Sequence, residues 1–166
     1  MTTKIGSEIT SKVIQLITGT SGVNSDLAAL TQAGGALASP LNAGQVRAQN
    51  VAPDIAEQSN AMHYPAMNVY CEKIVNNLAE KFPSFSGSVQ AVVEVRHSQD
   101  RLDGLQDGLE TYADAVVQVL NANRGDWGDG MFYGGAYQVT FGAVKHGGKN
   151  FMQVAKITFE IGVSRS

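Results

Sequence analysis

The final part of the chain alternates apolar and polar residues, and this pattern constrains the fold more than any other feature. Residues 135–145 read GAYQVTFGAVK and residues 150–165 read NFMQVAKITFEIGVSR. A period of two is typical of a strand with one buried and one wetter face. Gly147 and Gly148, between the two runs, can supply the positive φ angles of a tight turn. The sequence therefore predicts a long antiparallel hairpin, which needs other elements to pack against.

Further segments show helical or strand periodicity. Residues 73–82 are ambiguous, because Ile74, Leu78 and Phe82 fit a helical face but the segment is short. The other segments predict a helix over 7–18, a strand over 64–71, a strand over 89–96 and a long helix over 100–123. We therefore expect an α+β fold: an about four-stranded, mostly antiparallel sheet with the long helix on one face, an N-terminal helix and an extended segment. The expected core contains Val93, Val95, Leu109, Val116, Leu120, Ile157 and Phe159.

The N-terminal third has a different composition. Residues 19–60 are rich in Ala, Gly, Ser, Asn and Gln, with a short helix capped by Ser25 or Asp26. We expect the rest of this segment to be mobile in the free chain and ordered by a partner. The predicted organisation is thus a helix and loop-rich segment over 1–60, followed by an α+β domain over 61–166.

Composition narrows the function classes. Charged residues make up 16% of the chain, against about 25% in typical soluble domains, which suggests that neighbouring subunits cover part of the surface. The alternative is a monomer with a surface of small polar residues. The net charge of −3 does not favour nucleic-acid binding. No apolar run reaches the length of a membrane span, no signal peptide is evident, and Cys71 is the single cysteine. We expect a protein made in the cytoplasm without disulfides.

No motif points to catalysis, a metal or a cofactor. The three histidines, His63, His97 and His146, are too widely spaced for a zinc site. The glycines of residues 125–135 lack the order of a phosphate-binding loop. The carboxylates that could form an acid–base pair are better explained as a solvated helix face; they are Glu94, Asp100, Asp103, Asp107 and Glu110.

Several residues are instead candidates for an assembly interface. Trp127 and Tyr133 belong to an aromatic cluster that serves either the core or an interface. The acidic helix start contains Asp103, Asp107 and Glu110, while the final hairpin is basic and contains Lys145 and Lys149. Such blocks can become complementary faces of a head-to-tail assembly, or they are simply solvated. An exposed edge strand would be a natural joining element.

Three runs in a fixed order carry a resemblance to a known family. They are YPAMNVY (64–70), VEVRHSQDRLDGLQDGLETYADAVVQVL (93–120) and GMFYGGAYQVTFGAVKHGGKNFMQVAKITFEIGVSR (130–165). Together they resemble the tail terminator proteins of long-tailed bacteriophages, also called tail completion or neck proteins. The resemblance implies a small, non-enzymatic α/β subunit that closes into a hexameric ring. It also implies tail tube and head connector proteins as partners, and DNA that passes through the ring without sequence-specific binding.

Two other classes stay open. One is a different structural protein of the same particle, such as a head-completion adaptor or a tube subunit. The other is a small enzyme or ligand-binding domain, which would be a monomer or dimer with a deep polar pocket.

Overall fold

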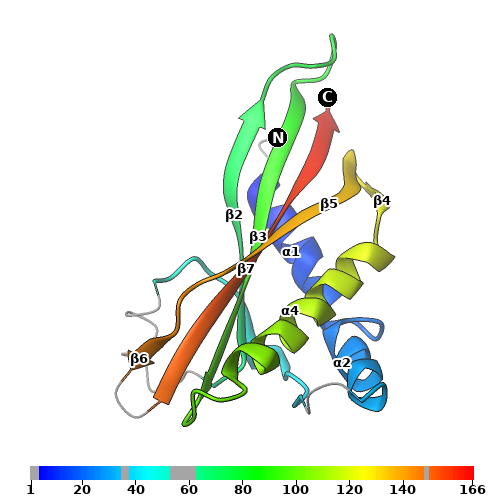
Figure 1. The fold of residues 1–166 in the computed structure, drawn as a ribbon. Coiled ribbons are helices and arrows are strands. Elements are labelled where there is room, and N and C mark those ends of the chain that lie inside the picture. The colour runs from blue at the N-terminus through cyan, green and yellow to red at the C-terminus, as the bar shows by residue number, and fades with distance from the viewer. Residues whose placement is uncertain (1–3, 35–37, 53–62, 148–149) are drawn as a thin grey trace.

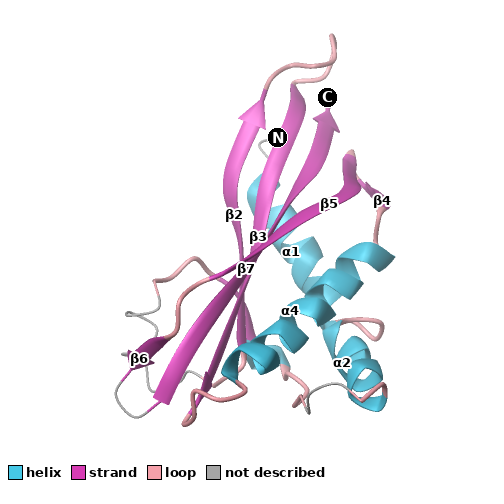
Figure 2. Ribbon diagram, viewed as in Figure 1, coloured by secondary structure: helices cyan, strands magenta, loops and turns pink. Residues whose placement is uncertain are grey.

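The structure is a computed structural model that describes residues 4–34, 38–52, 63–147 and 150–166. Its centre is one curled sheet, a half-barrel, with the helices gathered on one side (Figure 1 and Figure 2). The helices are α1 (Ile5–Thr18), α2 (Val23–Gln32) and α4 (Leu105–Ala122), with a 3-10 turn over Ala43–Gln45. The strands are β1 (Val46–Ala48), β2 (Ala66–Asn76), β3 (Phe85–Gln99), β4 (Gly125–Gly128), β5 (Met131–Phe141), β6 (Lys145–Gly147) and β7 (Asn150–Arg165).

The strand order is β1-β2-β3-β7-β5-β4, and β6 pairs separately with β7. Only the short β1–β2 pair is parallel; the other pairs are antiparallel. The longest ladder joins β3 to β7, from Phe85 opposite Arg165 to Gln99 opposite Phe151. β7 is therefore the central strand of the sheet, with β3 on one side and β5 and β6 on the other.

The predicted sheet of about four strands with one long helix on a face is wrong. The described residues form seven strands, and α1 and α2 pack into the same core as α4. Strands β1, β4 and β6 are only three or four residues long, too short to show a period of two. β2 also continues to Asn76, through a bulge between Cys71 and Lys73 that interrupts its alternation.

The individual long elements lie close to their predicted positions. α4 begins at Leu105 rather than at residue 100, because Gly104 has a φ of 78° and adopts the left-handed conformation that interrupts a helix. The seven residues expected in the core are all buried there. α4 packs on β3 and β7, and alternate residues of each strand face it.

Part of the N-terminal segment is attached to this core. Leu41 and Val46 are buried in it. The Tyr112 hydroxyl on α4 accepts a hydrogen bond from the backbone N–H of Ser39 at 3.1 Å. Asn24 of α2 bonds both the N–H and the carbonyl of Leu41, each at 2.7 Å. The expected mobility of residues 19–60 in the free chain stays a prediction.

Candidate functional site

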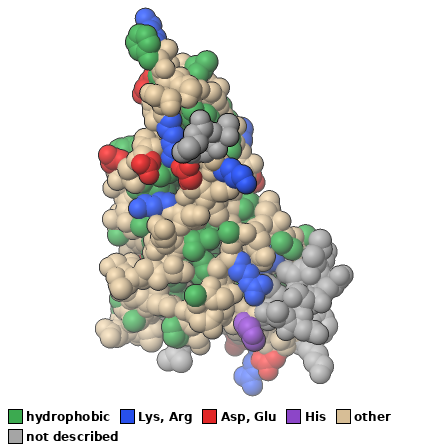
Figure 3. Space-filling model, turned by 180° about the vertical axis from the view of Figure 1, so that it is seen from behind, with side chains coloured by type: hydrophobic (Ala, Val, Ile, Leu, Met, Phe, Trp, Pro, Cys, Tyr) green, Lys and Arg blue, Asp and Glu red, His purple; other side chains and the backbone are tan. Residues whose placement is uncertain are grey.

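The β2–β3 hairpin projects beyond the helices at one end of the molecule (Figure 1). We call residues 77–84, which connect the two strands, the hairpin tip. Phe82 is 93% exposed and Leu78 is 60% exposed, and Ile74 on the adjoining strand is half exposed. In the space-filling view the narrow upper end carries hydrophobic side chains at its extremity (Figure 3). Large apolar side chains that protrude into solvent are typical of a contact with another molecule.

Side chains at the base hold the hairpin tip in place. The Asn76 carboxamide oxygen accepts hydrogen bonds from the N–H groups of Leu78 at 3.3 Å and Ser86 at 3.0 Å. The Ser86 hydroxyl accepts one from the N–H of Glu80 at 3.2 Å, and Ser164 on β7 donates one to the Glu80 carboxylate at 2.7 Å. These hydrogen bonds restrain the backbone of the tip, which lowers the conformational entropy lost on binding.

A buried polar network lies on the sheet face opposite α4, toward the other end of the molecule. Arg96 is 1% exposed and donates two hydrogen bonds to Glu94, which is 4% exposed. The Tyr70 hydroxyl donates to the other oxygen of Glu94 at 3.1 Å, and Arg96 also donates to the carbonyl of Val51. Burial, and then the neighbouring Glu94 carboxylate, raise the pKa of Tyr70. The network fixes residues 49–52 over the sheet.

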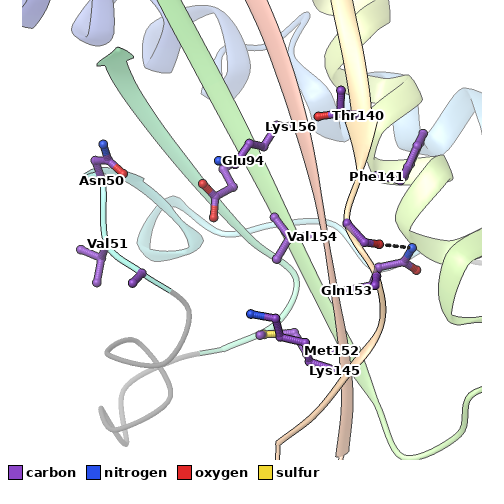
Figure 4. A pocket seen from close by; sticks show the side chains of 13 residues that line it. Asn50, Val51, Glu94, Thr140, Phe141, Lys145, Met152, Gln153, Val154 and Lys156 are labelled. Atoms are coloured by element: carbon purple, nitrogen blue, oxygen red, sulfur yellow. Dashed lines mark hydrogen bonds between the residues drawn. The ribbon is translucent and has the colours of Figure 1, made fainter.

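A cavity of about 450 Å³ opens beside this network (Figure 4). Residues 50–52 form one wall and residues 140–143 of β5 and its following loop form the other. The floor carries Glu94 and the apolar side chains of Met152 and Val154. Its volume lies within the roughly 300–1,000 Å³ of ligand pockets, and it combines apolar walls with a few charged groups. We call it the β-face cavity.

The β-face cavity is also bordered by two lysines. Lys145 on β6 and Lys156 on β7 are both exposed, and neither is paired with a carboxylate among the described residues. Both oxygens of the Glu94 carboxylate already accept hydrogen bonds, one from Arg96 and the other from Tyr70. Among the described residues, the unpaired charge at the mouth of the cavity is therefore positive.

One edge of the sheet is open over several residues. β4 pairs with β5 only at Met131–Tyr133, so in the described part of the chain the outer side of residues 137–141 has no strand beside it. Tyr137 and Phe141 on this stretch are each about two-fifths exposed. An open edge with aromatic side chains offers both backbone hydrogen bonds and apolar area to a neighbour.

The acidic candidates lie at the surface. Asp103 precedes α4, and Asp107 and Glu110 lie on its first turns, all three exposed. Glu110 accepts a hydrogen bond from Gln106 at 3.1 Å, and no described ion pair involves these three acids. The start of α4 follows the end of β3, where Gln99 pairs with Phe151 at the beginning of β7. The acidic helix start and the basic β6–β7 region thus lie at the same end of the chain's long sheet (Figure 1).

The other candidates divide between core and surface. The rings of Trp127 and Tyr133 are 5.8 Å apart, and Trp127 donates a hydrogen bond from Nε1 to the carbonyl of Asn123 at 2.7 Å. Tyr133 is buried in the core against Phe159, so it has no surface to offer in the single chain. Lys145 is exposed, and Lys149 lies outside the described residues.

The sequence did not predict the burial of Glu94 or the exposure of Phe82. Glu94 was grouped with solvated acids, although it alternates with valines in VEVR, a spacing that places it on the same strand face as Arg96. Phe82 fits a helical face in the ambiguous segment 73–82, which Pro83 ends, and this spacing does not indicate that the side chain is exposed. Nothing in the sequence alone places the loop of residues 49–52 over Glu94.

The described side chains form no metal-binding cluster, and burial shifts the pKa of titratable groups such as Cys71 and His97. No group of three His, Cys, Asp or Glu among them could hold a metal ion. Burial raises the pKa of the Cys71 thiol and lowers the pKa of the His97 imidazole, and in both cases it favours the uncharged form. None of the described helices combines the length and hydropathy needed to cross a lipid bilayer.

Comparison with protein-family models finds no match to this chain, and comparison with curated proteins finds no relative.

Proposed function

We propose that this chain is a structural protein of a long-tailed bacteriophage, a tail terminator. Its copies close into a ring, of six subunits in the family it resembles, which caps the finished tail tube and joins it to the head connector. DNA passes through the ring without sequence-specific contacts. The protein is made in the host cytoplasm and resides in the neck of the virion. No catalytic step is part of this function.

The observation that carries the proposal is the ordered resemblance of residues 64–165 to that family. Two surface features support it: the hairpin tip and the open edge at residues 137–141 are apolar and lie on different elements. A closed ring needs two different contact surfaces on each subunit, because each subunit meets its neighbours head to tail.

Electron microscopy of the purified chain, alone and with tail tubes, tests the proposal. We expect single rings, formed either free in solution or only on tube ends, and tubes that stop growing once capped. Long tubes made of this chain alone would instead identify a tube subunit. A stable monomer that neither binds tube ends nor occurs in virions would contradict the proposal.

The β-face cavity favours one competing function, a small ligand-binding domain. A chain with that function would be a monomer or dimer in which a small molecule fills the space beside Glu94. Thermal-shift screening with small anionic and amphipathic compounds distinguishes the two functions. Binding by a chain that never assembles would support the ligand-binding domain.

A further inference from the structure

We infer that the hairpin tip of one copy inserts Phe82 into the β-face cavity of the next copy, as the head-to-tail contact of the assembly. This inference rests on the proposed function in one respect, that copies of the chain meet. It adds which two surfaces meet and which side chain anchors them.

The hairpin tip has the properties of an anchor. Phe82 is almost fully exposed and Leu78 in the same loop is 60% exposed, so the single chain leaves a large apolar area in water. Aromatic side chains bury about 150–250 Å² each and dominate interface energetics. The hydrogen bonds from Asn76 and Ser86 hold the loop backbone without using the apolar side chains. Such a tip can enter a partner with little rearrangement.

The β-face cavity has the size and lining to receive that anchor. An engineered apolar cavity of about 150 Å³ holds a benzene ring, so 450 Å³ accommodates the Phe82 ring together with part of a neighbouring side chain. Val51, Met152 and Val154 supply apolar contacts within it. The Arg96–Glu94 network makes its floor rigid, since every oxygen of the Glu94 carboxylate is hydrogen-bonded.

The geometry points to a second copy because the two surfaces cannot meet within one chain. The tip adjoins the start of β3 at Phe85, whereas the cavity lies around Glu94 and the beginning of β7. At about 3.3 Å per residue these positions are roughly 30 Å apart along the strand. A projecting group and a cavity at opposite ends of one chain form a heterologous contact, the kind that builds rings or filaments.

Of the two charged residues of the tip, Glu80 has the sign opposite to that of the lysines at the cavity mouth and Lys81 has the same sign. The tip carries one carboxylate, Glu80, two residues before Phe82, and the cavity mouth carries Lys145 and Lys156, which have no carboxylate partner among the described residues. Opposite charges at the rim of an apolar contact favour the correct orientation and speed association more than they add affinity. Lys81, the other charged residue of the tip, lies beside Phe82 and is exposed.

Disulfide trapping tests the contact directly. Lys81→Cys and Ala143→Cys are introduced together into a chain in which Cys71 is replaced by serine, so that Phe82 remains intact. Ala143 is exposed and lines the cavity. Oxidation of the concentrated protein is expected to produce a covalent ladder of multimers in denaturing gels. Neither single cysteine variant can extend beyond a dimer.

Adding Phe82→Ser to this double-cysteine chain is expected to reduce the ladder at least about tenfold, because the anchor is lost. Leu102→Ser is the matched control: Leu102 is 58% exposed, lies before α4 and belongs neither to the hairpin tip nor to the residues that line the cavity. It should leave the ladder unchanged. Circular dichroism and the urea midpoint confirm that each variant is folded.

A mixing experiment gives a second readout. Ala143→Trp fills the cavity from an exposed position, so it blocks the receiving surface and leaves the tip free. Mixed with Phe82→Ser, it should form only a heterodimer of two 17.6 kDa chains, since one functional tip and one functional cavity remain. Each variant alone should stay monomeric.

The two proposals fail in different ways. Rings that form without a ladder, or a ladder insensitive to Phe82→Ser, overturn the contact and leave the ring function standing. A Phe82-dependent ladder that extends into open filaments rather than rings supports the contact and contradicts the terminator function. Absence of a ladder under all conditions, including with tail tubes present, overturns the contact.

Discussion

Arg96 reaches back along its own strand and donates two hydrogen bonds to one oxygen of Glu94, from Nε at 2.9 Å and from Nη2 at 2.7 Å. Residues two apart on a strand face the same side, so the pair forms within β3 alone. The Tyr70 hydroxyl from β2 also donates a hydrogen bond to Glu94, and Arg96 donates one to the carbonyl of Val51. One buried ion pair thus links two strands and the loop that forms a wall of the β-face cavity.

Replacing Arg96 with methionine should destabilise the fold by about 3–5 kcal/mol, because Glu94 is left as a buried charge without its partner. The urea midpoint, with an unchanged denaturant slope, measures this loss. The double variant Glu94→Leu/Arg96→Met should lose much less than the sum of the two single variants, since it removes both charges. Additive losses would show that the two side chains do not act as a pair.

Stability should fall as the pH is lowered through the range where histidine titrates. Burial lowers the pKa of His97, whose ring lies 5.4 Å from that of Tyr112, so the folded state takes up its proton less readily than the unfolded state. The unfolded chain therefore binds more protons below about pH 6.5, and the free energy of unfolding decreases there as the pH drops. Above that pH the contribution is constant.

Urea unfolding of the wild type and of His97→Gln at about pH 8 and about pH 5 measures this effect, because the variant removes the titrating group. The variant should show the smaller drop between the two conditions. NMR titration gives the pKa of His97 directly. Equal drops in both proteins would mean that other groups cause the acid sensitivity.

Gly87, near the base of the hairpin tip, should not tolerate a side chain. A Cβ at Gly87 would collide with the backbone carbonyl of Val75 on the paired strand. Gly87→Ala should therefore cost about 1–3 kcal/mol and disturb the presentation of the tip. Gly134→Ala is the matched control, because a Cβ there has open space around it. Thermal unfolding of the two variants compares them, and equal midpoints would contradict the prediction.

Reversing Asp107 and Glu110 to lysine should weaken assembly and leave folding within about 0.5 kcal/mol, since both side chains are exposed. The effect should shrink at high salt, because exposed charges are screened within roughly 8–10 Å at physiological ionic strength. Gln118→Lys with Asn121→Lys, exposed near the other end of α4, is the control. Normal assembly with slower DNA passage would place the acids along the channel instead. Normal assembly and normal infectivity would mean that they are solvated.

Helices and strands whose apolar period extends over many residues were predictable from the sequence. The body of α4, most of β3 and the seven core residues follow from apolar residues spaced at the helix or strand period. Strands β1, β4 and β6 were not predictable, because three or four residues form a strand only where a longer neighbour supplies the hydrogen bonds. Counting only the long elements therefore led to a sheet of about four strands.

The candidate surfaces were predictable only in part. The exposure of Asp107 and Glu110 follows from their place on the polar side of α4. The burial of Glu94 depends on residues 49–52 and on Tyr70, which the sequence does not bring together by any local rule. The exposure of Phe82 depends on β2 ending at Asn76, which leaves residue 82 in the connecting loop. The bulge at Cys71 interrupts the alternation of β2, so the sequence does not show where this strand ends.

The position of β7 has a consequence for synthesis. β3 and β5 do not pair with each other; each pairs with β7, which follows them both in the sequence. While the chain emerges from the ribosome, these strands keep unsatisfied edges until residues 150–165 are made. The sheet therefore closes late and through non-local contacts, which slow folding. A chain interrupted before residue 150 would lack the central strand and expose two long edges prone to aggregation.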